Sequence, residues 1–444
     1  MAKFHSQYVC QQCGYAQVGW SGRCPECQSW GSLVETVTRE EKGSESKPGN
    51  KKSAKPVTLD SIPVKSTVRI STKISELDRV LGGGLVPGQV VLIAGEPGIG
   101  KSTILLQVAS QIGETLYVSG EESSGQIKLR AERLGIKGKS IGLLEETDVD
   151  LIIENADTNP DVHGSKNPLK AIIIDSIQTM ITTDLSGMAG SVGQVRECAS
   201  RLVRLAKSTN IPIFIVGHVT KQGSVAGPSV LMHIVDTVLW FEGDKTLPVR
   251  VIRAVKNRFG ATDEVGIFSM EEKGLVSMDS PEKIFLSETK NNLPGTVITS
   301  VMEGSRPLLI EVQSLVVPTK MAYPKRIAQG MDTKRFELLL AILQRRCNIP
   351  FYEFDAFVNI AGGISIKNDP SADLAVCLSL ASSYFDKALP KGSIAIGEVG
   401  LLGDVREVVA LDKRVKEASR LGYRIPITSK AIKYLQEGIR KYLK

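Results

Sequence analysis

The sequence has no apolar run near the roughly 20 residues that a membrane-spanning helix requires. Its start, MAKFHSQYVC, lacks the hydrophobic region of a signal peptide. Apolar residues at 42% and charged residues at 23% exclude wholesale disorder. We therefore expect a folded cytoplasmic protein without a membrane partner, and its 444 residues suggest two or three domains.

The sequence also lacks an excess of either charge over its first 280 residues, which hold 31 Lys and Arg against 31 Asp and Glu. Residues 281–444 hold 24 against 17, and the whole chain carries +7. A basic surface in the last third would attract a polyanion. Nucleic acid is expected before a membrane, because no lipidation or amphipathic signal accompanies the charge. A solvated surface of mixed charge explains the same count, so both interpretations stay open.

Only seven cysteines are present, and four of them form two Cys-x-x-Cys pairs. The pairs are Cys10 with Cys13 and, after a gap of ten residues, Cys24 with Cys27. Four thiolates at this spacing predict a tetrahedral Zn²⁺ site, because a reducing cytoplasm argues against two disulfides. Residues 1–35 are therefore expected to form a small zinc finger that folds only with its metal. We expect Trp20 and Trp30 to form its miniature core, with exposed stacking surfaces as the alternative.

The text from residue 36 to residue 58 is rich in Lys, Ser, Glu, Gly and Pro and has no apolar periodicity. Such a composition cannot bury a core and predicts a flexible linker. Residues 59–275 then alternate apolar runs (VVLIAG, TLYVSG, AIIIDS and IPIFIVG) with helical stretches. Continuous β-branched runs separated by helices are typical of a parallel sheet covered on both faces, which is an α/β fold.

The segment GEPGIGKST follows the first of these runs and opens a helix. Its glycine-rich backbone and helix start predict a phosphate-binding loop for ATP. The loop comprises Gly95, Glu96, Pro97, Gly98, Ile99, Gly100, Lys101, Ser102 and Thr103. Lys101 is expected to reach the outer two phosphates. Ser102 and Asp175, which ends the neighbouring strand AIIID, are expected to hold Mg²⁺ or its water shell. The alternative for Asp175 is an ordinary helix cap.

A carboxylate that orients the attacking water is expected just after TLYVSG. Glu121 is the predicted catalytic base, with Glu122 beside it, since the spacing cannot separate the two. His218, which follows IFIVG, could sense the terminal phosphate, although a lone histidine is more often structural.

Several longer segments occur in order along the chain: LGGGLVPG, YVSGEES, VGHVTKQG, HIVDTVLWFEG and KNRFG, behind the four cysteines. With them the sequence resembles the RadA (Sms) family of bacterial DNA repair proteins over nearly its whole length. The resemblance implies a RecA-like ATPase core, a homo-oligomeric hexameric ring and DNA-stimulated ATP hydrolysis. It also implies a helicase-type motor that promotes branch migration in recombinational repair, with a RecA-type recombinase as partner.

The KNRFG motif consists of Lys256, Asn257, Arg258, Phe259 and Gly260. In RecA-like rings cations of the next subunit enter the ATP site, and the resemblance implies this catalytic role for Lys256 and Arg258. We call such a side chain a finger. Side chains two residues apart on a strand point the same way, which suits a pair of fingers. The alternative is a surface pair that contacts DNA or nothing.

In a RecA-like core two Gly- and Ser-rich loops would contact DNA, here residues 182–192 and residues 219–229, which carry Lys221. Such loops bind phosphates without reading bases, so binding to single-stranded or branched DNA should be sequence-independent and sensitive to salt. Further contacts are expected on the densest basic stretch of the last third. Its residues are Lys320, Lys325, Arg326, Lys334 and Arg335.

Residues 283–444 resemble the proteolytic domain of Lon, an α+β domain, in segments such as NDPSADLAVCLSLASS and GEVGLLGDVREVVALDKR. Ser371 occupies the place of the nucleophile, but the place of the lysine base falls on Asp412, with Lys413 beside it. Since aspartate cannot readily replace that lysine, we expect an inactive scaffold domain, with Ser371 as a helix cap or turn residue. The remaining alternatives are an ATP-dependent serine protease like Lon and a nucleotide-switched adaptor without motor activity.

Overall fold

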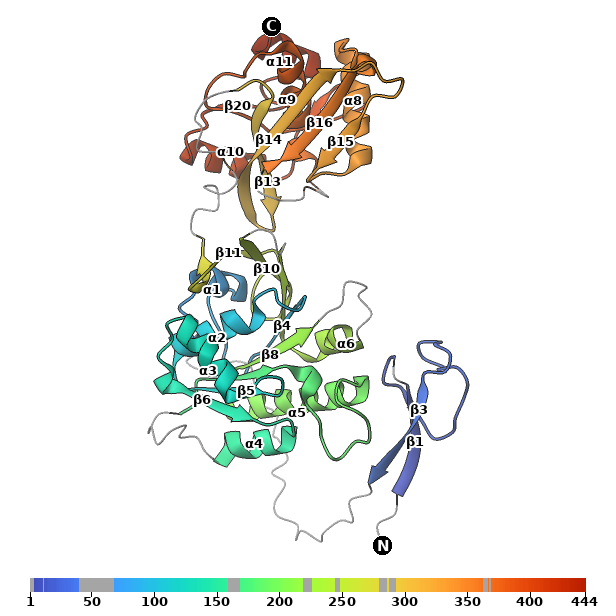
Figure 1. Cartoon of the computed structure of the whole chain (residues 1–444), viewed down its shortest axis with the longest axis vertical. Coiled ribbons are helices and arrows are strands. Elements are labelled where there is room, and N and C mark those ends of the chain that lie inside the picture. The colour runs from blue at the N-terminus through green and yellow to red at the C-terminus, as the bar shows by residue number, and fades with distance from the viewer. Residues whose placement is uncertain are drawn as a thin grey trace, which may run out of the picture. The chain divides into compact units, whose positions relative to one another are not determined.

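The computed structural model describes residues 4–10, 12–39, 68–158, 168–218, 226–243, 248–278, 286, 293–361, 366 and 369–444. The chain divides into two compact units, Met1–Met278 and Asp279–Lys444. The first unit contains a small cysteine-rich ribbon and a larger α/β domain (Figure 1). In the described part of the chain no helix is long and apolar enough to cross a membrane.

The cysteine-rich ribbon is a three-stranded antiparallel sheet in the order β2-β1-β3. Its strands are β1 (Phe4–Cys10), β2 (Ala16–Gln17) and β3 (Leu33–Arg39). β3 pairs with the whole of β1, so the ribbon continues to Arg39, beyond the boundary at residue 35 that the sequence suggests. The rest of the predicted linker lies outside the described residues.

A nine-stranded sheet forms the centre of the α/β domain, in the order β12-β11-β10-β9-β4-β8-β7-β5-β6. The strands from β9 to β6 are parallel, and the other three continue the sheet antiparallel. The parallel strands are β4 (Val90–Gly95), β5 (Thr115–Ser119), β6 (Ile141–Glu145), β7 (Ala171–Asp175), β8 (Ile213–His218) and β9 (Thr237–Glu242). The antiparallel strands are β10 (Val249–Asn257), β11 (Val265–Glu271) and β12 (Gly274–Ser277). The predicted parallel sheet is therefore confirmed.

Helices cover both faces of this sheet because its central strands are apolar on both sides (Figure 1). Along β4, Val91 and Ile93 enter one core, and Val90 and Leu92 enter the other. The helices over the first core are α1 (Ser75–Leu81), α2 (Lys101–Ile112) and α3 (Ser124–Arg133). Those over the second are α4 (Val149–Thr158), α5 (Val192–Thr209) and α6 (Ala226–Ile234). Each buried aliphatic side chain contributes about 1.5–3 kcal/mol, so the apolar runs dictate the layered fold.

The carboxyl ends of the parallel strands meet at one edge of the sheet, where Gly95 pairs with His218 and Ser119 pairs with Asp175. The sequence suggests that Asp175 ends the strand next to the phosphate loop, but β8 lies between β4 and β7. Because all of these strands run in the same direction, the crossover still brings Asp175 to the edge where the loop lies.

The second unit is an α+β domain around a four-stranded sheet in the order β13-β14-β16-β15. These strands are β13 (Thr296–Glu303), β14 (Arg306–Pro318), β15 (Arg326–Gln329) and β16 (Phe354–Ile360). The apolar helix α9 (Asp373–Phe385) packs on this sheet, and its residues from Asp373 to Ser382 are all buried. The remaining elements are α8 (Thr333–Cys347), β17 (Ser393–Ala395), β18 (Glu398–Val399), β19 (Val405–Arg406), α10 (Leu411–Arg420), β20 (Ile425–Ile427) and α11 (Leu435–Tyr442). The α+β prediction agrees with this architecture.

Candidate functional site

The phosphate loop connects β4 to α2. Gly100 precedes the helix with φ +118°, a left-handed conformation that a side chain would strain. A Cβ atom there would also approach Met270 Cε to 2.8 Å. Because glycine brings no side chain to cap the helix, the N–H groups of the first turn are available to phosphate oxygens.

Lys101, the first residue of α2, folds back over the loop. Its Nζ donates hydrogen bonds to the carbonyls of Gly95 and Glu96, each at 2.9 Å, and the side chain is buried. Burial lowers the pKa of Lys101 to about 8, while the charges of Asp175 and Glu121 oppose that shift. The ammonium group therefore lies within electrostatic reach of both carboxylates, and a bound phosphate would favour its charged form further.

Asp175 ends β7 as a buried carboxylate. Its Oδ2 accepts a 2.5 Å hydrogen bond from the hydroxyl of Tyr117. No hydrogen bond reaches the other oxygen, Oδ1, from the residues that the structure describes. Carboxylate and hydroxyl oxygens are the ligands that Mg²⁺ prefers, so Asp175 and Ser102 offer a donor set that fits this ion.

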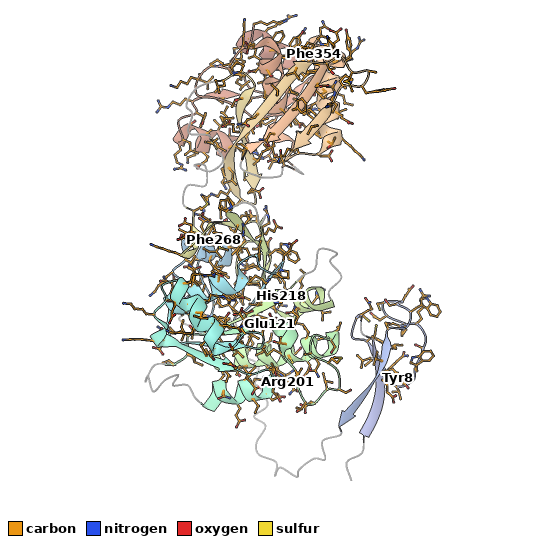
Figure 2. All side chains as sticks on the ribbon, viewed as in Figure 1. Tyr8, Glu121, Arg201, His218, Phe268 and Phe354 are labelled. Carbon is orange, nitrogen blue, oxygen red and sulfur yellow. The ribbon has the colours of Figure 1, made fainter. Side chains whose placement is uncertain are left out.

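Glu121 and Glu122 follow β5 and have different surroundings. The Glu121 carboxylate accepts a 2.5 Å hydrogen bond from Ser176 Oγ and lies 3.3 Å from His218 Nε2 (Figure 2). The Glu122 carboxylate pairs instead with Arg130 of α3. Glu121 therefore faces the ends of β7 and β8, whereas Glu122 faces a helix. The geometry thus separates two carboxylates that the sequence spacing leaves equivalent.

The KNRFG motif ends β10 at the opposite edge of the sheet from the phosphate loop of its own chain. Thr237 pairs both with Val91, near the start of β4, and with Asn257, at the end of β10. Gly95, where the phosphate loop begins, pairs with Phe241. Along β9, Thr237 and Phe241 are four residues and therefore about 13 Å apart, which is longer than an arginine side chain.

The two cations of the motif differ in how firmly they are held. Lys256 Nζ donates to the carbonyls of Met232 and Val235, at 2.7 and 2.8 Å, at the end of α6. Arg258 lies 3.3 Å from the buried carboxylate of Asp236, and 55% of its side chain is exposed. Arg258 is therefore the cation with more freedom to meet another molecule.

The rest of the motif shapes the turn after β10. Asn257 Oδ1 accepts a hydrogen bond from the Phe259 N–H at 3.0 Å. A Cβ atom on Gly260 would approach Gly82 Cα to 3.2 Å and Asn257 Nδ2 to 2.8 Å, so the two backbones cross too closely for a side chain. The turn that presents Arg258 therefore depends on Asn257 and Gly260, and on Arg69, which donates to the Phe259 carbonyl.

We call the edge of the sheet that carries the phosphate loop the phosphate edge. Two residues there were not found by sequence analysis. Tyr117 contacts Asp175, and Arg250, at the start of β10, donates from Nε to the Ile99 carbonyl in the phosphate loop at 3.2 Å. Both side chains are buried. A tyrosine or arginine at an inward position of an apolar strand needs a buried polar partner, and that is the signal that could have found them.

The four N-terminal cysteines converge on one point. All four sulfur atoms lie within 4.8 Å of one another, with 3.5 Å between Cys10 and Cys27 and 3.6 Å between Cys13 and Cys24. Four Zn–S bonds of about 2.3 Å in a tetrahedron require S···S separations of about 3.8 Å. The sulfur set therefore fits a Zn²⁺ ion.

The prediction of a tryptophan core in the ribbon is wrong. Trp20 and Trp30 are 65% and 77% exposed. The small core consists of Cys10, Cys24 and Leu33 instead. The metal ligands occupy the centre of so small a sheet, which leaves no space there for indole rings.

Ser371 lies buried in the 3₁₀ helix η8 (Pro370–Ala372), and its hydroxyl is held by two protein groups. Its Oγ donates to the Ser300 carbonyl at 3.0 Å and accepts from Arg414 Nη1 at 2.7 Å. Arginine stays protonated at any working pH, so it cannot remove the proton that a nucleophilic serine must lose. Of the two predicted roles, the turn is correct, but the cap is Asp369, which accepts from the Ser371 N–H.

Asp412 and Lys413 lie at the surface and contact other residues than Ser371. Asp412 is 91% exposed and pairs with Lys430 at 3.1 Å, and Lys413 donates to a backbone carbonyl. The residue of α10 that reaches Ser371 is Arg414, which sequence analysis did not single out.

Arg414→Met should reduce the stability of the second unit by about 3 kcal/mol, because Asp369 would lose its buried partner. Burial alone would raise the pKa of Asp369, but the Met302 N–H and the charge of Arg414 lower it, so the carboxylate is ionised and needs the cation. Hydrogen exchange of residues 293–444 in increasing urea measures the loss. Lys413→Met is the surface control and should change stability by less than about 0.5 kcal/mol. Equal effects of the two substitutions would contradict this role of Arg414.

The basic residues predicted to contact DNA fall into two groups. Arg326 donates to backbone carbonyls, and Arg335 pairs with a buried aspartate, so both serve the fold of the domain. Lys320, Lys325 and Lys334 are exposed. Lys221 lies outside the described residues.

The two predicted DNA loops are described only in part. Residues 182–191 have no regular structure, and the buried amide of Gln194 anchors their start through Thr182 and Leu185. Residues 219–225 lie outside the described part, and the next four residues begin α6.

Comparison with known proteins identifies the family. A family model described as the KaiC ATPase matches residues 70–281, and one described as a rubredoxin metal binding domain matches residues 8–35. A DNA repair protein RadA of Bacillus subtilis (strain 168) is 45% identical over 438 residues, which cover 96% of this chain and 92% of the relative. A DNA repair protein RadA of Streptococcus pyogenes serotype M6 is 46% identical over 430 residues, which cover 95% and 92%.

Among solved structures, one described as an ATPase domain matches with a TM-score of 0.40 and 14% identity, covering 48% of this chain and 93% of that one. The curated relatives are far closer and extend over almost the whole length. They confirm the resemblance found in the motifs, and the chain belongs to the RadA family of DNA repair proteins.

Proposed function

We propose that this protein is a DNA-dependent ATPase motor that promotes branch migration in recombinational DNA repair. The observation that carries the proposal is the division of the catalytic groups: the phosphate loop lies at one edge of the sheet and Arg258 at the other. Because one chain cannot bring both groups to the same ATP site, a second copy is needed to complete it. An assembly of such copies around DNA can convert ATP hydrolysis into movement along the strand.

Within one subunit the phosphate edge would bind and orient the substrate. The loop and Lys101 would hold the phosphates of ATP, and Ser102 and Asp175 would hold Mg²⁺. When bound, Mg²⁺ neutralises the charge that develops on the transferred phosphoryl group. Glu121 would take a proton from the attacking water, since its carboxylate faces this edge while that of Glu122 is engaged by a helix.

Arg258 of one subunit would enter the ATP site of the next and stabilise the transition state. Lys256 would support it as a second finger once it leaves the end of α6. Contacts in which different surfaces of identical subunits meet head to tail close into a ring when the rotation fits. We propose a hexameric ring, in line with the family resemblance.

DNA is the proposed polyanion, bound through its phosphates and without sequence preference. The name of the relatives, DNA repair protein RadA, supports this assignment. Exposed lysines of the second unit, Lys325 and Lys334 among them, suit phosphate contacts. A RecA-type recombinase is the proposed protein partner.

The Lon-like protease alternative finds no support at Ser371. Its hydroxyl proton is directed at a backbone carbonyl, and the group beside it is the guanidinium of Arg414 rather than a base. We therefore propose that the second unit is a scaffold of the ring that also contacts DNA.

The proposal predicts that single-stranded DNA raises the rate of ATP hydrolysis about tenfold or more. Because the DNA contacts are mainly to phosphates, this stimulation should fall steeply between about 50 and 200 mM salt. Phosphate release measured with single-stranded, branched and no DNA tests this, with Lys101→Ala as the inactive control. A rate that is the same with and without DNA would favour the nucleotide-switched adaptor.

A further inference from the structure

Tyr117 places a phenolic hydroxyl on the carboxylate of Asp175. The tyrosine lies in the middle of β5, and its side chain is only 1% exposed. Its hydroxyl donates a 2.5 Å hydrogen bond to Asp175 Oδ2. In the parallel register Tyr117 pairs with Ile173 and Ser119 pairs with Asp175, so the two residues lie on the same face of neighbouring strands.

The hydroxyl is not needed to fill the core around Tyr117. The ring belongs to an apolar cluster with Ile127, Ile173 and Phe214, and a phenylalanine ring would occupy almost the same volume. Burying a hydroxyl without a partner costs about 1–3 kcal/mol, so the group persists in this cluster only because the carboxylate accepts its hydrogen bond. What the hydroxyl adds is a fixed orientation of the Asp175 carboxylate.

We propose that Tyr117 is a positioning residue that orients Asp175 for Mg²⁺. The inference rests on the magnesium role proposed above. With Oδ2 held by Tyr117, rotation of the carboxylate about its terminal bond is restrained, and Oδ1 remains for the ion or its water. A partner that orients a metal ligand in this way typically controls metal affinity by a factor of about 10 to 100.

Tyr117→Phe removes one oxygen atom and keeps the ring. The first measurement is binding of a fluorescent ADP analogue, without turnover, in Mg²⁺ and in EDTA. We expect the affinity in Mg²⁺ to fall about tenfold or more and the affinity in EDTA to stay within about twofold of the wild type. The Mg²⁺ concentration that gives half-maximal ATP hydrolysis should rise by a similar factor.

Two further variants distinguish positioning from a general effect. Asp175→Asn should remove most of the Mg²⁺ dependence of nucleotide binding. Tyr117→Phe should add nothing in that background, because it acts only through Asp175. Tyr423→Phe, which removes a partly buried phenol from the second unit, should bind nucleotide as the wild type does.

The proposal is overturned if Tyr117→Phe keeps the Mg²⁺ dependence of the wild type. It is also overturned if the affinity falls equally in Mg²⁺ and in EDTA with a lowered melting temperature, since that pattern belongs to a residue of the core. A double variant that binds nucleotide clearly more weakly than Asp175→Asn would also overturn the proposal. If the wild type itself binds no nucleotide, the proposed ATPase function fails instead.

Discussion

Equal mixing of Lys101→Ala and Arg258→Ala subunits is expected to restore ATP hydrolysis that neither variant retains alone. The first variant keeps Arg258, and the second keeps an intact phosphate loop. In a head-to-tail ring, a junction is complete only where the intact loop of an Arg258→Ala subunit meets the Arg258 finger of a Lys101→Ala subunit. Random mixing makes about a quarter of the junctions complete, so we expect about a quarter of the wild-type rate.

The recovery should be easy to detect because the loss without a finger is large. A finger supplied by a neighbour accelerates phosphoryl transfer by about a thousandfold or more. The sheet register keeps Arg258 about 13 Å or more from the loop of its own chain, so no cis contact should compensate. Arg258→Ala should therefore bind nucleotide normally and hydrolyse it very slowly, as measured by phosphate release across mixing ratios.

Arg253→Ala is the matched control. Arg253 lies on the same strand, β10, and pairs with Glu242 at 3.0 Å, where both side chains are partly exposed. Loss of such a surface pair should leave the rate near that of the wild type. No recovery at any ratio, with assembly verified by light scattering, would contradict the shared site. Wild-type activity of Arg258→Ala alone would do the same.

The glycine-rich loop between β4 and α2 and the cluster of four cysteines could be predicted because their parts are adjacent in the chain. The strand VVLIAG, the glycines and Lys101 follow one another, so conformation and chemistry are specified together. Each Cys-x-x-Cys pair is likewise formed by near neighbours in the chain, and a metal ion has only to join the two pairs. The alternating apolar strands likewise predict the parallel sheet before any long-range contact is known.

Contacts that depend on strand register could not be predicted. Glu121 and Glu122 are equivalent in the sequence, and only the positions of Ser176 and Arg130 separate them. The interposed β8, the location of KNRFG at the far edge and the contact of Tyr117 with Asp175 have the same origin. Each joins residues from different strands whose order the local pattern does not contain.

In the second unit, counting residues along the Lon-like segment did not find the residue that contacts Ser371. The count leads to Asp412, but the inward face of α10 is formed by Leu411, Arg414 and Ala418. Residues three and four apart share a face of a helix, so the periodicity of α10 is the signal that could have pointed to Arg414. The contact of Arg414 with Ser371 follows from that face.

Removal of zinc is expected to unfold the ribbon and leave the ATPase core folded. Structural zinc contributes roughly 10–16 kcal/mol in finger-sized domains. Among the ribbon side chains that the structure describes, the buried core is Leu33 with two of the ligands, and Tyr8 packs against it, so little apolar burial remains without the metal. A zinc-selective chelator, used with Mg²⁺ in excess, should therefore abolish amide protection in β1 and β3. Basal ATP hydrolysis should persist, because the phosphate loop and its partners lie within residues 68–278.

Thiol labelling gives the second readout, because the seven cysteines fall into two classes. The four ligands should react with iodoacetamide only after chelation. The others should stay unreactive in the folded protein, since burial raises the pKa of Cys198 to about 12 and of Cys347 to about 11, and that of Cys377 well above its ordinary value. Adding Zn²⁺ but not Mg²⁺ should restore protection, because thiolates select the softer ion. Protected β1 and β3 amides in metal-free protein would contradict this dependence, and labelling of all seven thiols would mean that the core unfolds with the ribbon.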